Sequence, residues 1–309
     1  MNGFLGQLGR SLADRWLNLL VLPGALYVSV VLAAGALGHA HPFDLSRLAD
    51  QVSAWARSPG ATTVGGQVVL VSAVLAAAGA TGLAARGLGG GIELLVLAAD
   101  WRTWPRPLRQ LADRLVAARR TDWDAARRDY DGLRDAAGRA RALGQPHDPA
   151  ARHAARAAMI RIAWERPDRP TWSGDRVHAT AVRLNRDHHL DLAVLWPHFW
   201  LTLPDSQRAE ITAARDALTR ATTLGGWAVL YALLAVVWWP AAVLAVVLAA
   251  VGRRRTRAAA QSYAQLLEAA VRLNVAQLAG ALGVEGAGGL TSDVGDRLSD
   301  VLDPMPLEE

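Results

Sequence analysis

Long apolar runs occur in three places along the chain, and polar segments separate them. The first extends from about Trp16 to Leu37, the second from Gly66 to Ala85, and the third from Ala221 to Gly252. Each of the first two holds about 20 residues without a charged side chain, enough for a helix to cross a hydrocarbon core about 30 Å thick. The pattern predicts an integral membrane protein.

The first run has a second interpretation, as a signal peptide. Its length argues against this, and so does an amphipathic segment before it with arginines beside its apolar positions. Those apolar positions are Phe4, Leu5, Leu8, Leu12 and Trp16. The second run is rich in small residues, which predicts close packing against the first. The glycines of residues 87–91 predict a break after it, followed by an interfacial segment over 92–99. A phosphate-binding loop is not favoured there, because no Lys-Ser/Thr follows the glycines.

The third run has Trp238-Trp239-Pro240 in its middle, so it is either one kinked span or two short ones. Its two halves would rise about 25 Å and about 18 Å at about 1.5 Å per residue. Arginine in short loops stays on the cytoplasmic side. A single crossing would place Arg253, Arg254 and Arg255 outside, whereas a hairpin places them inside. The loop 39–63 balances its two arginines with two aspartates, which favours the outside.

The predicted fold is therefore all-α, with about four transmembrane helices and both termini in the cytoplasm. Two helices are N-terminal, two form a C-terminal hairpin, and a cytoplasmic helical domain lies between them. The expected divisions are 1–100, 101–220, 221–252 and 253–309. Apolar periodicity predicts helices over 107–144, 149–163, 206–219, 257–282 and 294–302. Residues 166–204 are expected to be irregular, and 303–309 disordered.

Composition changes this picture little. The chain has 309 residues, 52% of them hydrophobic, and its mean hydropathy is +0.14. All 33 basic residues are Arg, which suggests a GC-rich genome whose codon bias supplies part of the arginine. The net charge of +5 favours a bilayer with anionic headgroups as partner. Nucleic acid is not favoured, because acidic residues are interleaved throughout. The absence of cysteine excludes disulfides and thiol catalysis.

One segment could carry chemistry. Asp187, His188, His189 and Asp191 are residue types that bind metal ions, and they echo a motif of some phosphoesterases. The further Asp and His motifs on strands that those enzymes need are missing, and a solvated turn is the alternative. The same logic applies to His39 and His41. No catalytic residue and no cofactor is predicted.

The segment from Arg166 to Leu282 resembles a family of uncharacterised bacterial membrane proteins. The resemblance rests on Pro170-Thr171 with Gly174-Asp175, on Asp191 before Trp196-Pro197, and on Leu203-Pro204. Members have a PT-x-x-G-N/D turn, a D-x4-WP segment and an LP, then a transmembrane hairpin and an amphipathic helix. The resemblance implies a hairpin at 221–252 and implies no activity.

The leading functional hypothesis is a non-enzymatic membrane scaffold, or an oligomeric effector that forms or gates a pore, with a homo-oligomer expected. A membrane-bound metal-dependent hydrolase with a site near Asp187 to Asp191 is one alternative. A small-solute transporter is another, although Arg86 and Glu93 are among the few charges near the spans.

Overall fold

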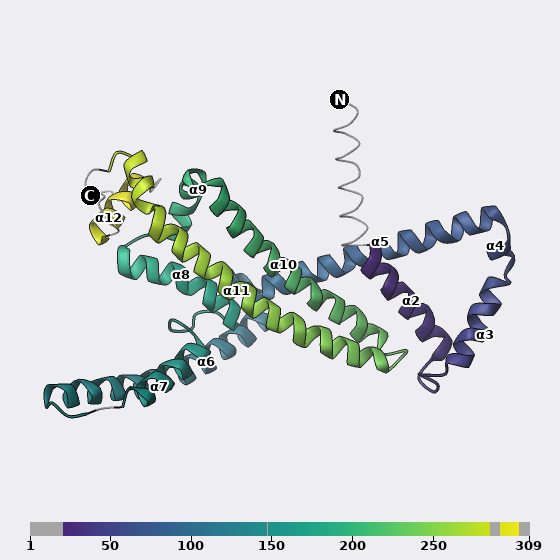
Figure 1. Ribbon diagram of the computed structural model, residues 1–309, viewed down its shortest axis with the longest axis horizontal. Coiled ribbons are helices and arrows are strands. Elements are labelled where there is room, and N and C mark those ends of the chain that lie inside the picture. Colours follow the sequence, from purple (N-terminus) through teal and green to yellow (C-terminus); the bar gives the residue numbers. More distant parts are fainter. Residues whose placement is uncertain (1–20, 147, 285–290, 303–309) are drawn as a thin grey trace. The chain divides into compact units, whose positions relative to one another are not determined.

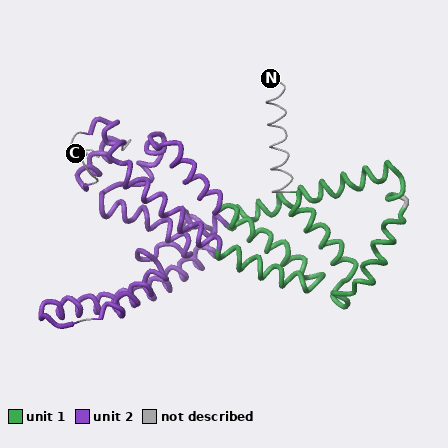
Figure 2. The backbone as a smooth tube through the Cα atoms, viewed as in Figure 1, with its two compact units in different colours: residues 1–92, 219–254 green, residues 93–218, 255–309 purple. Residues whose placement is uncertain are grey.

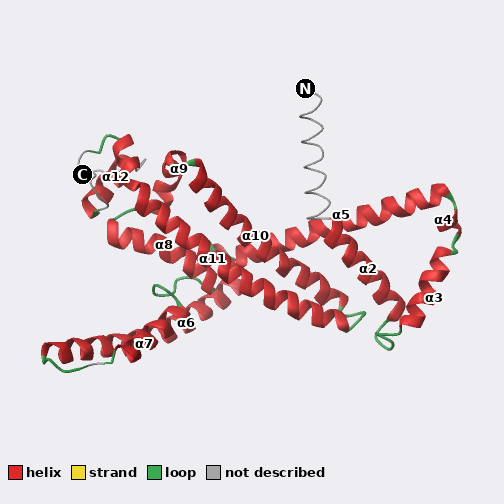
Figure 3. Cartoon of the chain, in the orientation of Figure 1, coloured by secondary structure: helices red, strands yellow, loops and turns green. Residues whose placement is uncertain are grey.

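The computed structural model describes residues 21–146, 148–284 and 291–302. These residues form helices joined by turns and contain no strand, so the all-α prediction is confirmed (Figure 3). The predicted amphipathic segment from Phe4 to Trp16 and the tail 303–309 lie outside the described residues. In chain order the elements are α2 (Leu22–Leu37), α3 (Leu45–Ala56), α4 (Pro59–Thr62), α5 (Val64–Leu97), the 3-10 turn η2 (Trp101–Thr103), α6 (Arg106–Ala142), α7 (Pro149–Ile162), α8 (Trp172–His188), α9 (Leu192–Thr202), α10 (Asp205–Leu234), α11 (Pro240–Ala281) and α12 (Ser292–Leu302) (Figure 1).

The chain divides into two compact units (Figure 2). Unit 1 takes residues 1–92 and 219–254, and unit 2 takes residues 93–218 and 255–309. The boundaries fall inside α5, α10 and α11. The segments on either side of the hairpin, which the sequence suggested as separate domains, therefore belong to one unit.

Unit 1 contains a helical hairpin at the third apolar run. Helix α10 ends at Leu234 and α11 begins at Pro240, where the missing proline N–H costs no helical hydrogen bond. Buried Tyr231 and Leu234 pack with Ala241 and Ala245 across the turn. Gly252, further along α11, lies against residues 221–225 of α10. The two arms are therefore antiparallel.

Unit 2 has an apolar core built by α8, α9, α10, α11 and α12. Phe199 and Leu195 of α9 are almost fully buried there with Leu184 of α8, Val271 of α11 and Leu298 of α12. A second part of unit 2 is the hairpin of α6 and α7, in which Trp123 packs against Met159 and donates from Nε1 to the carbonyl of Ala163 at 3.1 Å. Asp148, just before Pro149, caps α7 by accepting from the N–H of Ala150 at 2.8 Å.

Two sequence expectations were wrong. The glycines at 87–91 do not break α5, which continues to Leu97. Gly89 is used for packing instead, since a Cβ there would lie 2.7 Å from the Cα of Thr223. Residues 166–204 are not irregular, because they contain α8 and α9. Apolar spacing did not predict helix α8, because its buried face is largely polar.

Candidate membrane-embedded surface

Small residues form the contacts between the helices of unit 1. Gly24 of α2 lies so close to Ala78 of α5 that a Cβ would overlap the alanine carbonyl. Gly226 of α10 lies equally close to the carbonyl of Ala85 on α5. Ala34, Ala78 and Ala85 are fully buried. Close backbone approach through glycine and alanine is the usual way in which helices pack inside a membrane.

Large aliphatic side chains cover the outer faces of the same helices. Val69 of α5 is 69% exposed, and Val236, at the turn after α10, is 79% exposed. The other exposed members are Leu22, Leu26, Val31 and Leu32 of α2; Val64, Val68, Leu70, Val71, Val74, Leu75, Leu83 and Leu88 of α5; Val229 and Leu233 of α10; Val237; and Val243, Leu244, Val246, Val247 and Val251 of α11. An apolar patch this large on a water-facing surface would be unusual, because monomers rarely expose more than a few hundred Å².

Three polar side chains on the helices of unit 1 donate to backbone carbonyls. The Tyr27 hydroxyl of α2 donates to the carbonyl of Leu230 on α10 at 3.0 Å, and its ring meets that of Tyr231 edge-on at 5.1 Å. Thr81 and Thr222 donate to backbone carbonyls one turn earlier on their own helices, at 2.7 Å and 3.0 Å. Such pairing is what a hydrocarbon environment requires, because no water is there to bond a polar group.

Aromatic side chains gather at the turn of the hairpin. Trp238 donates from Nε1 to the carbonyl of Pro42 at 3.0 Å, and Nδ1 of His39 lies 2.6 Å from the carbonyl of Val237. Trp239 meets Phe43 edge-on at 5.8 Å. The loop after α2 is thus joined to the turn after α10. Tryptophan and its neighbours at the end of apolar helices are typical of a membrane–water interface.

The opposite end of the hairpin is basic. Arg86 on α5, Arg220 on α10, and Arg253 and Arg254 on α11 are all exposed, and we call these four residues the arginine belt. Two contacts between helices place them near the same end of the hairpin: Gly89 packs on Thr223, and Gly252 packs beside Ala221. In a helix these four positions are no more than about two turns apart along the axis.

Length separates α5 from the other apolar helices. Among the described residues, α5 alone is long and apolar enough, by length and composition, to cross a membrane, and α2 is a shorter apolar helix. The apolar arms of the hairpin, Ala221–Leu234 and Pro240–Gly252, each rise about 20 Å at about 1.5 Å per residue. A full crossing by either arm would need a thinner bilayer core than the usual thickness of about 30 Å.

The predicted metal ligands are neighbours in unit 2, but three of them have different partners. Asp187 pairs with Arg186 at 2.8 Å, and Asp191 caps α9 by accepting from the N–H of Ala193 at 2.8 Å. His189 ends α8 in the left-handed conformation (φ 53°), and its Nδ1 lies 2.9 Å from the Asp296 carboxylate. The Nε2 of His188 is buried and has no hydrogen-bond partner among the described residues. In the described chain no three His, Asp or Glu side chains, including His39 and His41, are grouped to hold a metal ion.

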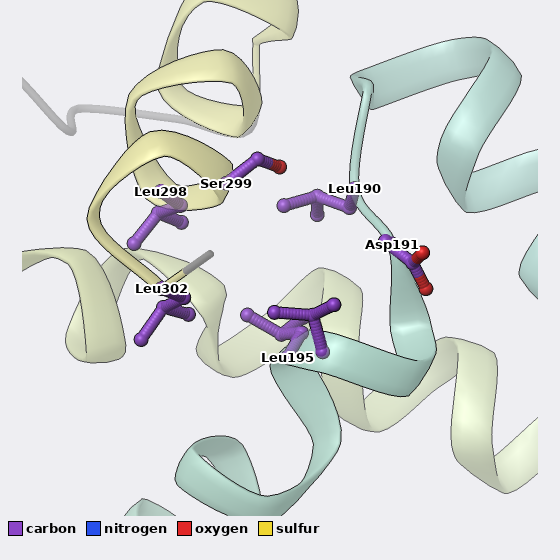
Figure 4. Close-up of a pocket in the computed structure, with 7 residues that line it drawn as sticks. Leu190, Asp191, Leu195, Leu298, Ser299 and Leu302 are labelled. Atoms are coloured by element: carbon purple, nitrogen blue, oxygen red, sulfur yellow. The ribbon is translucent and has the colours of Figure 1, made fainter. Parts of the chain in front are cut away.

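Helix α12 docks on this same segment. Gly295 lies so close to the carbonyl of His188 that a Cβ would overlap it, and Ser299 donates from Oγ to the carbonyl of His189 at 3.1 Å. Figure 4 shows the pocket between α12 and α9, with Leu298, Ser299 and Leu302 facing Leu190, Asp191 and Leu195. Its volume of about 10 Å³ leaves room for one water molecule at most. The segment therefore serves helix packing in this structure.

A ladder of polar contacts between α8 and α11 was not foreseen. Arg176 donates from Nε to Gln261 at 2.5 Å, Thr180 donates to the carbonyl of Ala264 at 3.2 Å, and Arg183 contacts Glu268. These pairs are 85, 84 and 85 residues apart, so the two helices run parallel in constant register. Burial, and then Arg183, lowers the pKa of Arg176 to about 10. Its guanidinium stacks over Trp164 with 4.5 Å to the ring centroid. The spacing of Arg176, Thr180 and Arg183 puts them on one face of a helix, and this is the sequence feature that could have indicated the contact.

The PT-x-x-G-D turn anchors the start of α8. Thr171 caps the helix by accepting from the N–H of Gly174 at 3.0 Å. The Asp175 carboxylate is 5% exposed and accepts from the N–H of Asp168 at 2.8 Å, from that of Arg169 at 2.7 Å, and from Arg119 at 2.6 Å. Burial raises the pKa of Asp175, and these donors oppose the rise. The motif thus has a structural role.

Comparison of the chain with family models, with curated proteins and with solved structures gives no match. The resemblance of 166–282 to a family of membrane proteins therefore stays a prediction from the sequence.

Proposed function

We propose that this chain is an integral protein of a bacterial plasma membrane and acts as a non-enzymatic scaffold. Unit 1 lies in the bilayer with four crossings, and unit 2 is cytoplasmic. The observation that carries this proposal is the distribution of side-chain size in unit 1. Glycine and alanine face the neighbouring helices, while valine and leucine face outward. A water-soluble protein buries its large apolar side chains, as unit 2 does with Phe199 and its neighbours.

The residues at the two ends of unit 1 determine the proposed orientation of the chain across the membrane. The arginine belt lies at one end, and the aromatic turn with His39 and Trp238 lies at the other. Positively charged residues next to spans favour the cytoplasmic side. Unit 2 follows the belt directly along α5 and α11, so we assign it to the cytoplasm. The short hairpin arms cross where the bilayer is locally thin.

The absence of cysteine allows a clean test of this topology. Ser53 of α3 and Ser206 of α10 are both exposed, and each can be replaced singly by Cys. We expect a membrane-impermeant maleimide to label Ser53→Cys in intact cells, and to label Ser206→Cys only after permeabilisation. Both variants should remain in the membrane pellet after carbonate washing and dissolve in detergent. Release by carbonate would overturn membrane insertion, and labelling of Ser206→Cys in intact cells would overturn the orientation.

A homo-oligomer remains part of the proposal. Gly87 and Gly91 of α5 are exposed, are four residues apart, and have open space around the position of a Cβ. Two such glycines permit close approach of a second helix in a membrane. We expect Gly87→Leu with Gly91→Leu to reduce the mass of the particle measured by light scattering in detergent. The exposed Gly35→Leu of α2 serves as control, and an unchanged mass in the double variant would contradict this contact.

A further inference from the structure

The arginine belt contains no compensating carboxylate. Segments 64–92 and 219–254 hold no Asp or Glu. Within the described residues, Arg86, Arg220, Arg253 and Arg254 make no ion pair or hydrogen bond from their side chains. Unit 2 is different, because Arg119 pairs with Asp175 and Arg183 with Glu268. The chain thus leaves its guanidinium groups uncompensated where the apolar surface ends.

Four exposed guanidinium groups within about two helical turns form a band of positive charge, and an anion beside them would offset their mutual repulsion. A phosphate diester has the geometry that arginine binds best, with two parallel N–H donors on two oxygens. The apolar surface beside the belt selects the source of that phosphate. A molecule that carries acyl chains can place them against Leu83 and Val251 while its phosphate meets the arginines. Free phosphate gains nothing from these side chains.

We propose that the arginine belt is a binding site for the headgroups of anionic phospholipids. The proposal rests on the insertion of unit 1 in the membrane. Zwitterionic lipids have the same phosphate but carry a cation next to it, so their net attraction to the belt is weaker. Lipids with a net negative charge, such as phosphatidylglycerol, are therefore preferred.

The test measures lipid selectivity on the purified full-length protein. Delipidated protein in detergent is mixed with equal amounts of phosphatidylglycerol and phosphatidylcholine, and the bound lipids are counted by native mass spectrometry. We expect a preference for phosphatidylglycerol of roughly fivefold, which decreases as salt is added. The variant R86Q/R220Q/R253Q/R254Q should bind the two lipids about equally, because its local charge is removed.

A matched control removes the same number of charges elsewhere. Arg128, Arg139, Arg141 and Arg156 of α6 and α7 are exposed, and their four Gln substitutions should leave the preference unchanged. Should the fourfold belt variant fail to insert, R253Q/R254Q provides a milder change with a smaller reduction. Lys at the same four positions keeps the charge, so the preference should remain, while the loss of the bidentate geometry should weaken the binding of both lipids.

Three outcomes would overturn the proposal. One is a wild-type protein without preference, the second is a belt variant that keeps the full preference, and the third is displacement of the lipid by inorganic phosphate but not by sodium chloride at the same ionic strength. Failure of membrane insertion is a separate result, seen when carbonate releases the wild-type protein from membranes. A protein that resists carbonate but binds both lipids equally would refute the lipid site alone.

Discussion

The side chain of Arg183 on α8 contacts that of Glu268 on α11, and both are largely buried, at 12% and 18% exposure. Glu268 also pairs with Arg272 at 3.1 Å, one turn further along α11. Arg176, one to two turns before Arg183, has no carboxylate partner among the described residues. Glu268 therefore pairs with two of the arginines between the two helices.

Replacing Glu268 with Ala should destabilise unit 2 by about 3 kcal/mol, because it leaves a buried guanidinium without its counter-ion. The free energy of unfolding can be measured by chemical denaturation in detergent, followed through tryptophan fluorescence. Asp131→Ala is the control, since its pairs with Arg127 and Arg134 are more exposed. That control should cost less than about 1 kcal/mol. Similar losses in the two variants would show that the ladder does not stabilise the fold.

Substitution of Gly226 with Ala tests the helix packing of unit 1. The added methyl group would overlap the Ala85 carbonyl, so α5 and α10 must move apart, at a cost of about 1–3 kcal/mol. Gly90→Ala is the matched control, because nothing lies within 4 Å of its Cβ position. It should be neutral or stabilise α5 by up to about 1 kcal/mol. The thermal midpoint in detergent reports both, and a stable Gly226→Ala would contradict the close contact.

The sequence pattern was sufficient for elements whose stability is local. Helices α6, α7 and α12 follow from apolar spacing and caps such as Asp148. The hairpin turn was favoured by the arginines at 253–255, because Pro240 alone left one kinked span as an alternative. The pattern was not sufficient for residues whose environment depends on a helix far away in the sequence. Arg176 and Thr180 look like surface residues until Gln261 and Ala264 of α11 are placed beside them.

The packing of the glycines could not be predicted from the local sequence either. Gly89 packs on Thr223, whereas Gly90 next to it has open space, and nothing in the local sequence separates the two. The four predicted metal ligands were singled out by residue type. Their partners, Asp296 for His189 and the N–H of Ala193 for Asp191, depend on where α12 and α9 begin and dock.

Asp175→Asn tests the anchor of α8. The amide oxygen can still accept from the N–H groups of Asp168 and Arg169, but the NH2 group that replaces the other oxygen cannot accept from Arg119. We expect a loss of about 2 kcal/mol, which loosens the whole anchor. Hydrogen exchange at the N–H groups of Asp168 and Arg169 should accelerate by roughly tenfold or more. Asp191→Asn makes the same chemical change at the exposed N-cap of α9, where asparagine caps as well as aspartate. Protection that persists at residues 168 and 169 would contradict the role of Asp175.

His178 on α8 should make unit 2 sensitive to acid. Burial, and then the nearby Arg169 guanidinium, lowers the pKa of His178 below its usual value of 6.5, although Asp168 and Asp175 oppose the shift. The unfolded chain then binds a proton at higher pH than the folded chain. Stability is complete above about pH 6.5 and is lost as the pH falls through the lower pKa of the folded state.

We expect His178→Gln to reduce the difference in thermal midpoint between about pH 7.5 and about pH 5.5, a range that spans the usual histidine pKa. The exposed His153 of α7 supplies the control, since its replacement by Gln should leave the difference unchanged. The direction of the change in stability with pH separates two possibilities. If the wild-type protein became more stable at the lower pH, and His178→Gln removed that gain, His178 would be held in its charged form by Asp168. The neutral form is expected because the ring is partly buried and because Arg169 lies closer than Asp168. The Nη2 of Arg169 is 3.5 Å from Nδ1 of His178, and the Asp168 carboxylate is 3.8 Å from Nε2.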